Sequence, residues 1–254
     1  TTSNSLKNSH VILGITGGIA ACESVRIARE IRRHGTTPEV FMTESATKII
    51  SKLAVEWAAK TPVSCDWSSE MSQLNPTDAI LICPASRNFI ARFVNGMMDH
   101  PLLMACSAGR ANGVPILMVP SMHNDLFGDP VTKELCSKAS EMGATIILGK
   151  NEEGRIKQPD PKQVVAELCH HTNRNQNSQH IAITLGANRA PIDAVRAIQN
   201  ASSGYTGWRI AEYLHRQGHT VTCIAGKTSS EPEFKLPRVI RAGAPNEMLQ
   251  CCIT

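Results

Sequence analysis

Aromatic side chains are scarce in this sequence, at 4% of the residues. They leave little surface on which nucleic-acid bases could stack. No stretch approaches the roughly 18 consecutive apolar residues that a membrane span needs. The opening residues, TTSNSLKNSH, lack the apolar core of a signal peptide. We therefore expect a cytoplasmic protein that binds neither nucleic acid nor membrane.

The nine cysteines include no C-x-x-C pair. Several lie inside apolar, strand-like runs, and the adjacent Cys251 and Cys252 lie near the end of the sequence. We expect reduced, mostly buried thiols and no metal site. The formal charge of +4 is spread along the chain, and its densest basic cluster, residues 29–34, is typical of a solvated helix face.

Strand and helix patterns alternate through the first two thirds of the chain. Apolar runs predict strands over residues 10–15, 37–42, 78–83, 114–119 and 145–148, with the third and fourth ending at Pro84 and Pro120. Helical patterns follow over residues 19–34 and 43–53. This order predicts an α/β protein built on a doubly wound parallel sheet, whose ligands bind beyond the carboxyl ends of the strands.

A polar stretch, CHHTNRNQNSQ, interrupts this pattern at residues 169–179. We interpret residues 1–170 as one domain, 171–179 as a linker and 180–254 as a second α/β unit. The second unit has predicted strands at 180–185 and 220–225 and a helix at 207–217. Roughly 75 residues are few for an independent doubly wound domain, which favours a truncated, partial Rossmann-like unit or one that another subunit completes.

Three loops follow predicted strands and carry residues suited to ligand binding. TGGIA at 16–20 places glycines between a strand and a helix, where the backbone can approach a phosphate or simply pack tightly. PASRN at 84–88 could contact a planar heterocycle, or Ser86 or Asn88 could merely cap a helix. PSMHNDLF at 120–127 contains His123, and a lone histidine is more often a satisfied polar group than a catalyst.

The motifs TGGIAA, MTESA, PASRNF with VNGMMD, and PSMHNDLFGDP occur in one order over residues 10–165. In this order they resemble the flavin-dependent phosphopantothenoylcysteine decarboxylase family. The resemblance implies a flavodoxin-like fold, an FMN cofactor, a cysteinyl thiol substrate in coenzyme A biosynthesis, and a trimer-based homo-oligomer. It assigns cofactor binding to Gly17, Gly18, Ile19, Thr43, Ser45, Ser86 and Asn88, substrate binding to Met122 and His123, and catalysis to Asn88 and His123.

Several positions depart from the family pattern. The family's catalytic histidine corresponds to Met71, and methionine cannot exchange a proton. Glu70 is the nearest titratable candidate for a catalytic role. The segment GKNEEGRI at 149–156 corresponds to a shortened flap without the family's cysteine. In the third loop His123 replaces an asparagine, and residues 126–127 replace methionine and tryptophan.

The segment LGANRAPIDAVRAIQNASSGYTG at 185–207 resembles the opening motif of phosphopantothenate cysteine ligase. The resemblance implies CTP and Mg²⁺ as ligands of the second unit. It assigns nucleotide contacts to Gly186, Asp193, Arg196, Asn200, Ser202, Ser203 and Gly204. The family's threonine, glutamate and lysine correspond here to Asn188, Ala190 and Tyr205, and loss of the lysine should weaken nucleotide binding.

Three functions stay open at this point. The first is a flavin-dependent decarboxylase with unusual residues. The second is an FMN-binding pseudoenzyme or subunit without decarboxylase activity, which Met71 and the short flap favour. The third is a nucleotide-binding module without flavin, for which a colourless purified protein would be the evidence.

Overall fold

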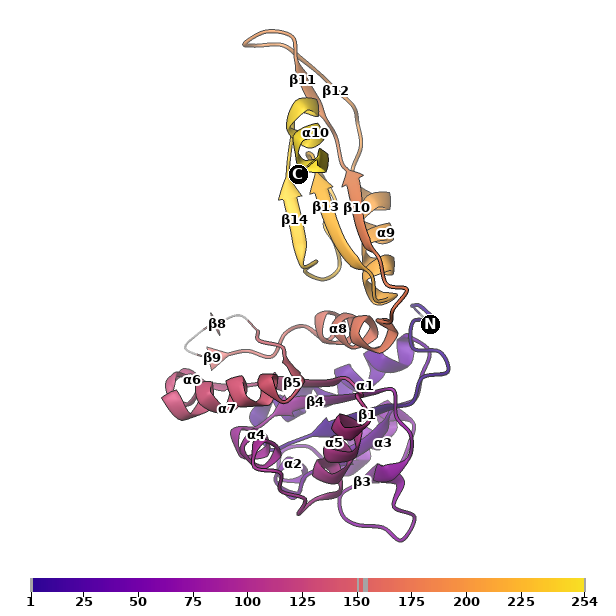
Figure 1. Cartoon of the computed structure of the whole chain (residues 1–254), viewed down its shortest axis with the longest axis vertical. Helices are drawn as coiled ribbons and strands as arrows, with labels where there is room; N and C mark the ends of the chain where they lie inside the picture. Colours follow the sequence, from indigo (N-terminus) through magenta and orange to yellow (C-terminus); the bar gives the residue numbers. More distant parts are fainter. Residues whose placement is uncertain (1, 150, 153–154, 254) are drawn as a thin grey trace. The chain divides into compact units, whose positions relative to one another are not determined.

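The computed structural model describes residues 2–149, 151–152 and 155–253. The chain divides into two compact units, Thr1–Thr172 and Asn173–Thr254 (Figure 1). No helix among the described residues is long and apolar enough to cross a membrane.

The first unit is built on a parallel sheet of six strands in the order β3-β2-β1-β4-β5-β7. Every neighbouring pair in it is parallel. The predicted parallel-sheet α/β fold is thereby confirmed. The strands are β1 (Val11–Ile15), β2 (Glu39–Met42), β3 (Val63–Ser64), β4 (Ala79–Ala85), β5 (Ile116–Pro120) and β7 (Ala144–Ile146).

Helices cover both faces of this sheet. Alternate residues of β1 enter different cores: Leu13 packs with α1, α3 and α8, whereas Ile12 packs with α4, α5 and α7. Burial on both faces explains why the strands read as nearly continuous apolar runs. The helices, including the 3₁₀ helices η1 and η2, are η1 (Ile19–Glu23), α1 (Ser24–Arg33), α2 (Glu44–Thr47), α3 (Lys52–Ala59), η2 (Ser72–Leu74), α4 (Arg87–Val94), α5 (Pro101–Ala111), α6 (Asn124–Gly128), α7 (Pro130–Glu141) and α8 (Pro161–Asn173).

Three predicted boundaries are wrong. Strand β4 runs through Pro84 instead of ending at it, whereas β5 ends at Pro120 as predicted. Pro84 lies where the register of β4 against β5 shifts, and a ladder irregularity is a place where proline is tolerated. The helix predicted over 43–53 is two helices, because Ser51 adopts an extended conformation and caps α3 by accepting the Ala54 N–H. Helix α8 extends into the predicted linker 171–179.

The second unit contains a parallel sheet of three strands in the order β10-β13-β14. Helix α9 packs on β10 and β13, and α10 packs on β13. An antiparallel pair, β11 and β12, forms a hairpin that extends away from this sheet (Figure 1). The bounds are β10 (His180–Leu185), β11 (Arg189–Pro191), β12 (Ala197–Gln199), α9 (Tyr205–Arg216), β13 (Thr220–Ala225), β14 (Arg238–Arg241) and α10 (Pro245–Ile253).

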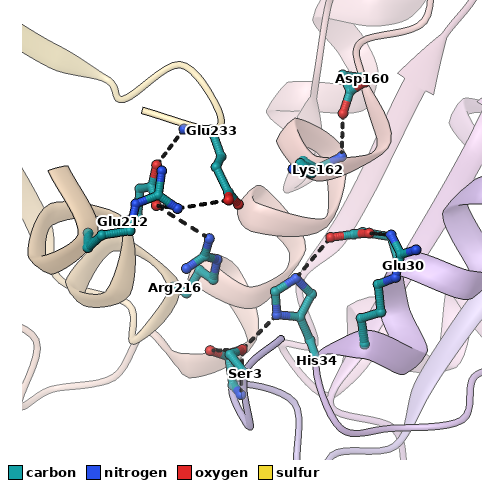
Figure 2. Close-up of polar contacts among 11 residues, drawn as sticks. Ser3, Glu30, His34, Asp160, Lys162, Glu212, Arg216 and Glu233 are labelled. Atoms are coloured by element: carbon teal, nitrogen blue, oxygen red, sulfur yellow. Dashed lines mark hydrogen bonds and ion pairs between the residues drawn. The ribbon is translucent and has the colours of Figure 1, made fainter. Parts of the chain in front are cut away.

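Ion pairs around the buried Glu212 join helix α9 to the loop before β14. Glu212 lies 3.0 Å from the guanidinium of Arg209, which in turn lies 2.8 Å from the Glu233 carboxylate (Figure 2). Glu212 also accepts the backbone N–H of Glu233. Burial raises the pKa of the Glu212 carboxyl in spite of these partners.

A buried cluster fixes the start of the chain to α1. The Ser3 hydroxyl lies 2.6 Å from Nδ1 of His34, and His34 Nε2 lies 3.4 Å from the Glu30 carboxylate (Figure 2). Arg33 donates to the same carboxylate at 2.8 Å. His34 and then Arg33 lower the pKa of Glu30 from 4.5 to about 2, against the opposing effect of burial.

We predict that Glu30→Gln lowers the free energy of unfolding of the first unit by about 3 kcal/mol at pH 7, from the size of the pKa shift. Because the folded pKa is depressed, this stabilisation is present above the ordinary pKa of 4.5 and disappears as the pH falls towards 2. Urea unfolding of both proteins between pH 7 and pH 2 measures the difference.

The control is Glu134→Gln, because Glu134 is an exposed residue that pairs with Lys138 on the surface of α7. It should change stability little at any pH. A Glu30→Gln deficit that stays constant from pH 7 to pH 2 would contradict the assignment.

Candidate functional site

Several predicted ligand-binding loops lie at one edge of the six-stranded sheet. Strands β2, β1, β4 and β5 are consecutive neighbours and run parallel, so their carboxyl ends meet at the same edge. Loops 16–19, 43–45, 86–88 and 121–123 follow these strands directly. This is the edge at which open parallel sheets bind ligands.

The side chain of Thr16 connects the loop at 16–20 to the loop at 84–88. Its side chain is fully buried, and its hydroxyl donates to the Pro84 carbonyl at 2.8 Å and accepts the Ser86 N–H at 2.7 Å. The Thr16 N–H donates to the same carbonyl at 3.3 Å. One side chain thus couples the end of β1 to the end of β4, a role that sequence reasoning missed because the bond spans 70 positions.

The glycine loop is shaped to face a ligand. A Cβ at Gly17 would lie 2.3 Å from Oγ of Ser45, so only glycine fits beside that hydroxyl. Oγ of Ser45 lies 3.1 Å from Oγ1 of Thr43. Within the described chain, the backbone N–H groups of Gly17, Gly18 and Ile19 have no hydrogen-bond acceptor. Unpaired N–H groups at a helix start, next to two hydroxyls, form a site suited to a phosphate.

The second loop begins helix α4. Ser86 is its N-cap and accepts the Phe89 N–H at 3.3 Å, so the capping role considered for this serine is present. Asn88 lies exposed in the first turn. Between them, Arg87 forms an ion pair with Asp129 at 2.6 Å, which links this loop to the start of α7. The Val131 N–H and the Arg87 guanidinium together lower the pKa of Asp129.

A cleft of about 770 Å³ opens between the first and third loops. Of the predicted residues, Ile19, Met122 and His123 line it. Its lining in the described chain consists of residues 19, 20, 23, 26, 121–123 and 157–161. His123 is half exposed, with Nδ1 lying 3.1 Å from the Asp125 carboxylate. The predicted residues Gly17, Gly18, Thr43, Ser45, Ser86 and Asn88 lie at the sheet edge without lining this cleft.

The predicted flap, 149–156, pairs with the third loop. Strands β8 (Asn151–Glu152) and β9 (Arg155–Ile156) pair antiparallel, and β9 also pairs antiparallel with β6 (Met122–His123). Positions 150, 153 and 154 of this segment lie outside the described residues. The pairing places the two candidate substrate residues of β6 next to the segment.

Position 71 holds no group that could transfer a proton. Met71 is partly exposed in a left-handed conformation, with φ of +48°, immediately before η2. Its sulfur lies 3.3 Å from the amide nitrogen of Gln73, a buried residue. Glu70 is exposed and is not among the residues that line the described cleft.

The second unit has a separate pocket of about 360 Å³ at the end of β10. The predicted residues Gly186, Ser202, Ser203 and Gly204 all line it. Gly204 has φ of +80°, and a Cβ there would lie 2.6 Å from the Thr228 side chain, which explains the glycine.

Three other predicted nucleotide residues are not among the lining of the described pocket. Asp193 and Arg196 pair with one another at 2.6 Å in the turn of the β11–β12 hairpin. The backbone N–H groups of Arg196 and Val195 hold the pKa of Asp193 below its usual value. Asn200 accepts the N–H of Asn188 at 2.7 Å.

Among the described residues, no group of three or more His, Cys, Asp or Glu side chains could hold a metal ion. All nine cysteines are free thiols. Burial raises the pKa of Cys106 to about 12 and also raises the pKa of Cys83, so both stay protonated at neutral pH.

We predict that Thr16→Val destabilises the first unit by about 1–3 kcal/mol, because valine has a similar shape but leaves the Pro84 carbonyl and the Ser86 N–H with fewer partners. Thr16→Ser keeps the hydroxyl and serves as the matched control. Urea unfolding of the two variants measures the difference, and equal stability would show that the hydroxyl bridge contributes nothing.

The sequence matches two protein families. Residues 1–173 match the Flavoprotein family, and residues 176–254 match the C-terminal domain of DNA/pantothenate metabolism flavoproteins. The coenzyme A biosynthesis bifunctional protein CoaBC of Thermococcus kodakarensis is 34% identical over 258 residues, which covers 98% of this chain and 63% of that protein. The chain spans about three fifths of the length of the curated relatives that it matches.

Solved structures share the fold of the first unit. A PPC decarboxylase mutant complexed with pantothenoylaminoethenethiol aligns with a TM-score of 0.53 at 18% identity, covering 64% of this chain and 97% of that one. The FMN-binding protein AtHal3 aligns with a TM-score of 0.53 at 18% identity, covering 64% and 95%. At these identities the likeness establishes the flavodoxin-like fold.

Proposed function

Because the chain belongs to the Flavoprotein family, we propose that its first unit binds FMN and decarboxylates a cysteinyl thiol compound of the phosphopantothenoylcysteine type in coenzyme A biosynthesis. The observation that carries this proposal is the convergence of the ligand-binding loops at one sheet edge, within the residues that the family match covers. The names of the CoaBC relatives and of the PPC decarboxylase structure support the reaction and the pathway.

The sheet edge offers a suitable phosphate site for FMN. The unpaired N–H groups of residues 17–19 would donate to the phosphate, and the hydrogen-bonded pair of hydroxyls on Thr43 and Ser45 would add one donor. Ser86 and Asn88, at the start of α4, would contact the ring. When bound, the flavin supplies the oxidation of the substrate thiol that makes loss of carbon dioxide easy.

The cleft beside this edge would hold the substrate. Met122 supplies an apolar contact, and His123 presents an imidazole at the cleft wall. Nδ1 of His123 accepts the Asp125 N–H at 3.3 Å and lies 3.1 Å from the Asp125 carboxylate, so Asp125 fixes the orientation of the imidazole at the cleft wall. Asn88 lies outside the lining of this cleft, so it would contact the substrate only where the substrate meets the flavin ring.

A second candidate function follows from Met71. The position that the family resemblance assigns to a base holds a thioether, and Glu70 beside it is exposed to solvent. A protein of this kind could bind FMN as a pseudoenzyme or subunit without turning over the thiol. Anaerobic mixing of the purified, flavin-loaded protein with phosphopantothenoylcysteine separates the two functions: bleaching of the flavin absorbance with release of carbon dioxide supports the decarboxylase, and a yellow protein that never bleaches supports the pseudoenzyme.

For the second unit, we propose that residues 186 and 202–204 bind CTP with Mg²⁺. Their pocket opens at the end of a parallel strand and at the start of α9, where backbone N–H groups favour phosphates. Asp193, Arg196 and Asn200 would reach the nucleotide only after rearrangement of the hairpin. We also propose a trimer-based homo-oligomer in the cytoplasm.

We predict that Met71→His raises the decarboxylation rate at least tenfold, since a positioned general base contributes about 10²–10⁴-fold. Histidine tolerates the left-handed backbone at this position better than most residues do. Release of carbon dioxide from phosphopantothenoylcysteine measures the gain. The control is Met71→Asn, which also suits this conformation but cannot titrate. Equal rates for the two variants would show that position 71 takes no part in proton transfer.

A further inference from the structure

The cleft of the first unit is lined by a polar side chain that the proposed function does not use. Gln158 lies between β9 and α8 and contributes to the cleft wall. Its carboxamide oxygen and nitrogen are both withdrawn from solvent, and neither has a hydrogen-bond partner in the described chain. Both polar atoms of one residue are therefore left unsatisfied.

An enclosed amide without partners destabilises a folded protein, and native structures keep few such groups unless a ligand or water completes them. No hydrogen bond holds the Gln158 carboxamide in place. Rotation of this side chain into the cleft therefore breaks no hydrogen bond of the carboxamide. The Gln158 carboxamide can leave its unsatisfied position and form hydrogen bonds with a molecule bound in the cleft.

One cationic side chain near Gln158 is already paired. Arg26 also lines the cleft, but its guanidinium lies 2.8 Å from Glu23 and 3.5 Å from Asp160. Two carboxylates balance its charge, so a phosphate would have to displace one of them. The Gln158 carboxamide itself is neutral, with both donors and an acceptor, and suits a neutral polar group.

We propose that Gln158 is a specificity-determining residue that hydrogen-bonds a secondary amide in the acyl chain of the thiol substrate. A carboxamide presents donors and an acceptor side by side, which complement the C=O and N–H of an amide. The pyrimidine edge of a flavin carries the same pair of atoms, but the position of Gln158 in a cleft shared with Met122 and His123 favours the acyl chain. The inference rests on the proposed decarboxylation.

The test compares Gln158→Met, which removes the polar atoms at similar length, with wild type and with Gln163→Met. Gln163 is a control because its amide bonds Glu167 on helix α8, at 3.2 Å. For the flavin-loaded full chain, we expect Gln158→Met to raise the Kd of phosphopantothenoylcysteine about tenfold, the loss expected for about two hydrogen bonds. We expect FMN affinity to stay the same and the melting temperature to stay the same or rise.

Three results for Gln158→Met overturn this inference and leave the proposed function in place. An unchanged Kd for phosphopantothenoylcysteine shows that Gln158 does not contact the substrate, while FMN binding and turnover by wild type leave the proposed function intact. A loss of FMN affinity without a change in thiol affinity assigns the amide contact to the flavin instead. A lower melting temperature of Gln158→Met alone assigns a structural role. If wild type takes up neither FMN nor the thiol, the proposed function fails first and this inference with it.

Discussion

The hydroxyl of Thr16 is the interaction on which the sheet edge depends. It is fully buried and bonds both the carbonyl of Pro84 and the N–H of Ser86, so the first loop cannot move without the second. The Arg87–Asp129 pair then extends the connection towards α7. A ligand at this edge therefore meets loops whose relative positions are set before it binds, which reduces the ordering cost of binding.

The parallel sheet and most of its buried strands could be predicted from sequence, and the predicted loops lie at its edge. Continuous apolar runs identified the buried strands because both faces of the sheet are covered, as the split of Ile12 and Leu13 between two cores shows. Glycines in the turns marked positions where the backbone lies too close to a neighbouring side chain for a Cβ atom, as at Gly17 beside Ser45. Motif order added the family, which the match over residues 1–173 bears out.

Long-range contacts could not be predicted. The Thr16–Ser86 bond and the Arg87–Asp129 pair join positions far apart in the sequence, and neither leaves a local pattern. Pro84 misled the strand boundary because proline is tolerated where a ladder is irregular, a feature that only the register reveals. Gln158 gave no signal either, since only the fold encloses its amide without giving it a partner.

The two units pose separate chemical questions. In the first, the sheet edge that we propose for the cofactor is well formed while the position expected to hold a base carries Met71, so binding and turnover can be separated experimentally. In the second, the pocket gathers the glycine and serine residues of the motif, whereas the charged pair Asp193–Arg196 is satisfied elsewhere. Ligand binding is thus better supported than catalysis in both units.

We propose above all that the first unit binds FMN at the edge formed by the carboxyl ends of its parallel strands. A crystal structure of the protein with FMN tests it most directly. The account predicts the phosphate at the N–H groups of residues 17–19, within hydrogen-bond distance of Thr43 or Ser45. A phosphate elsewhere, or protein that fails to take up FMN, would contradict it.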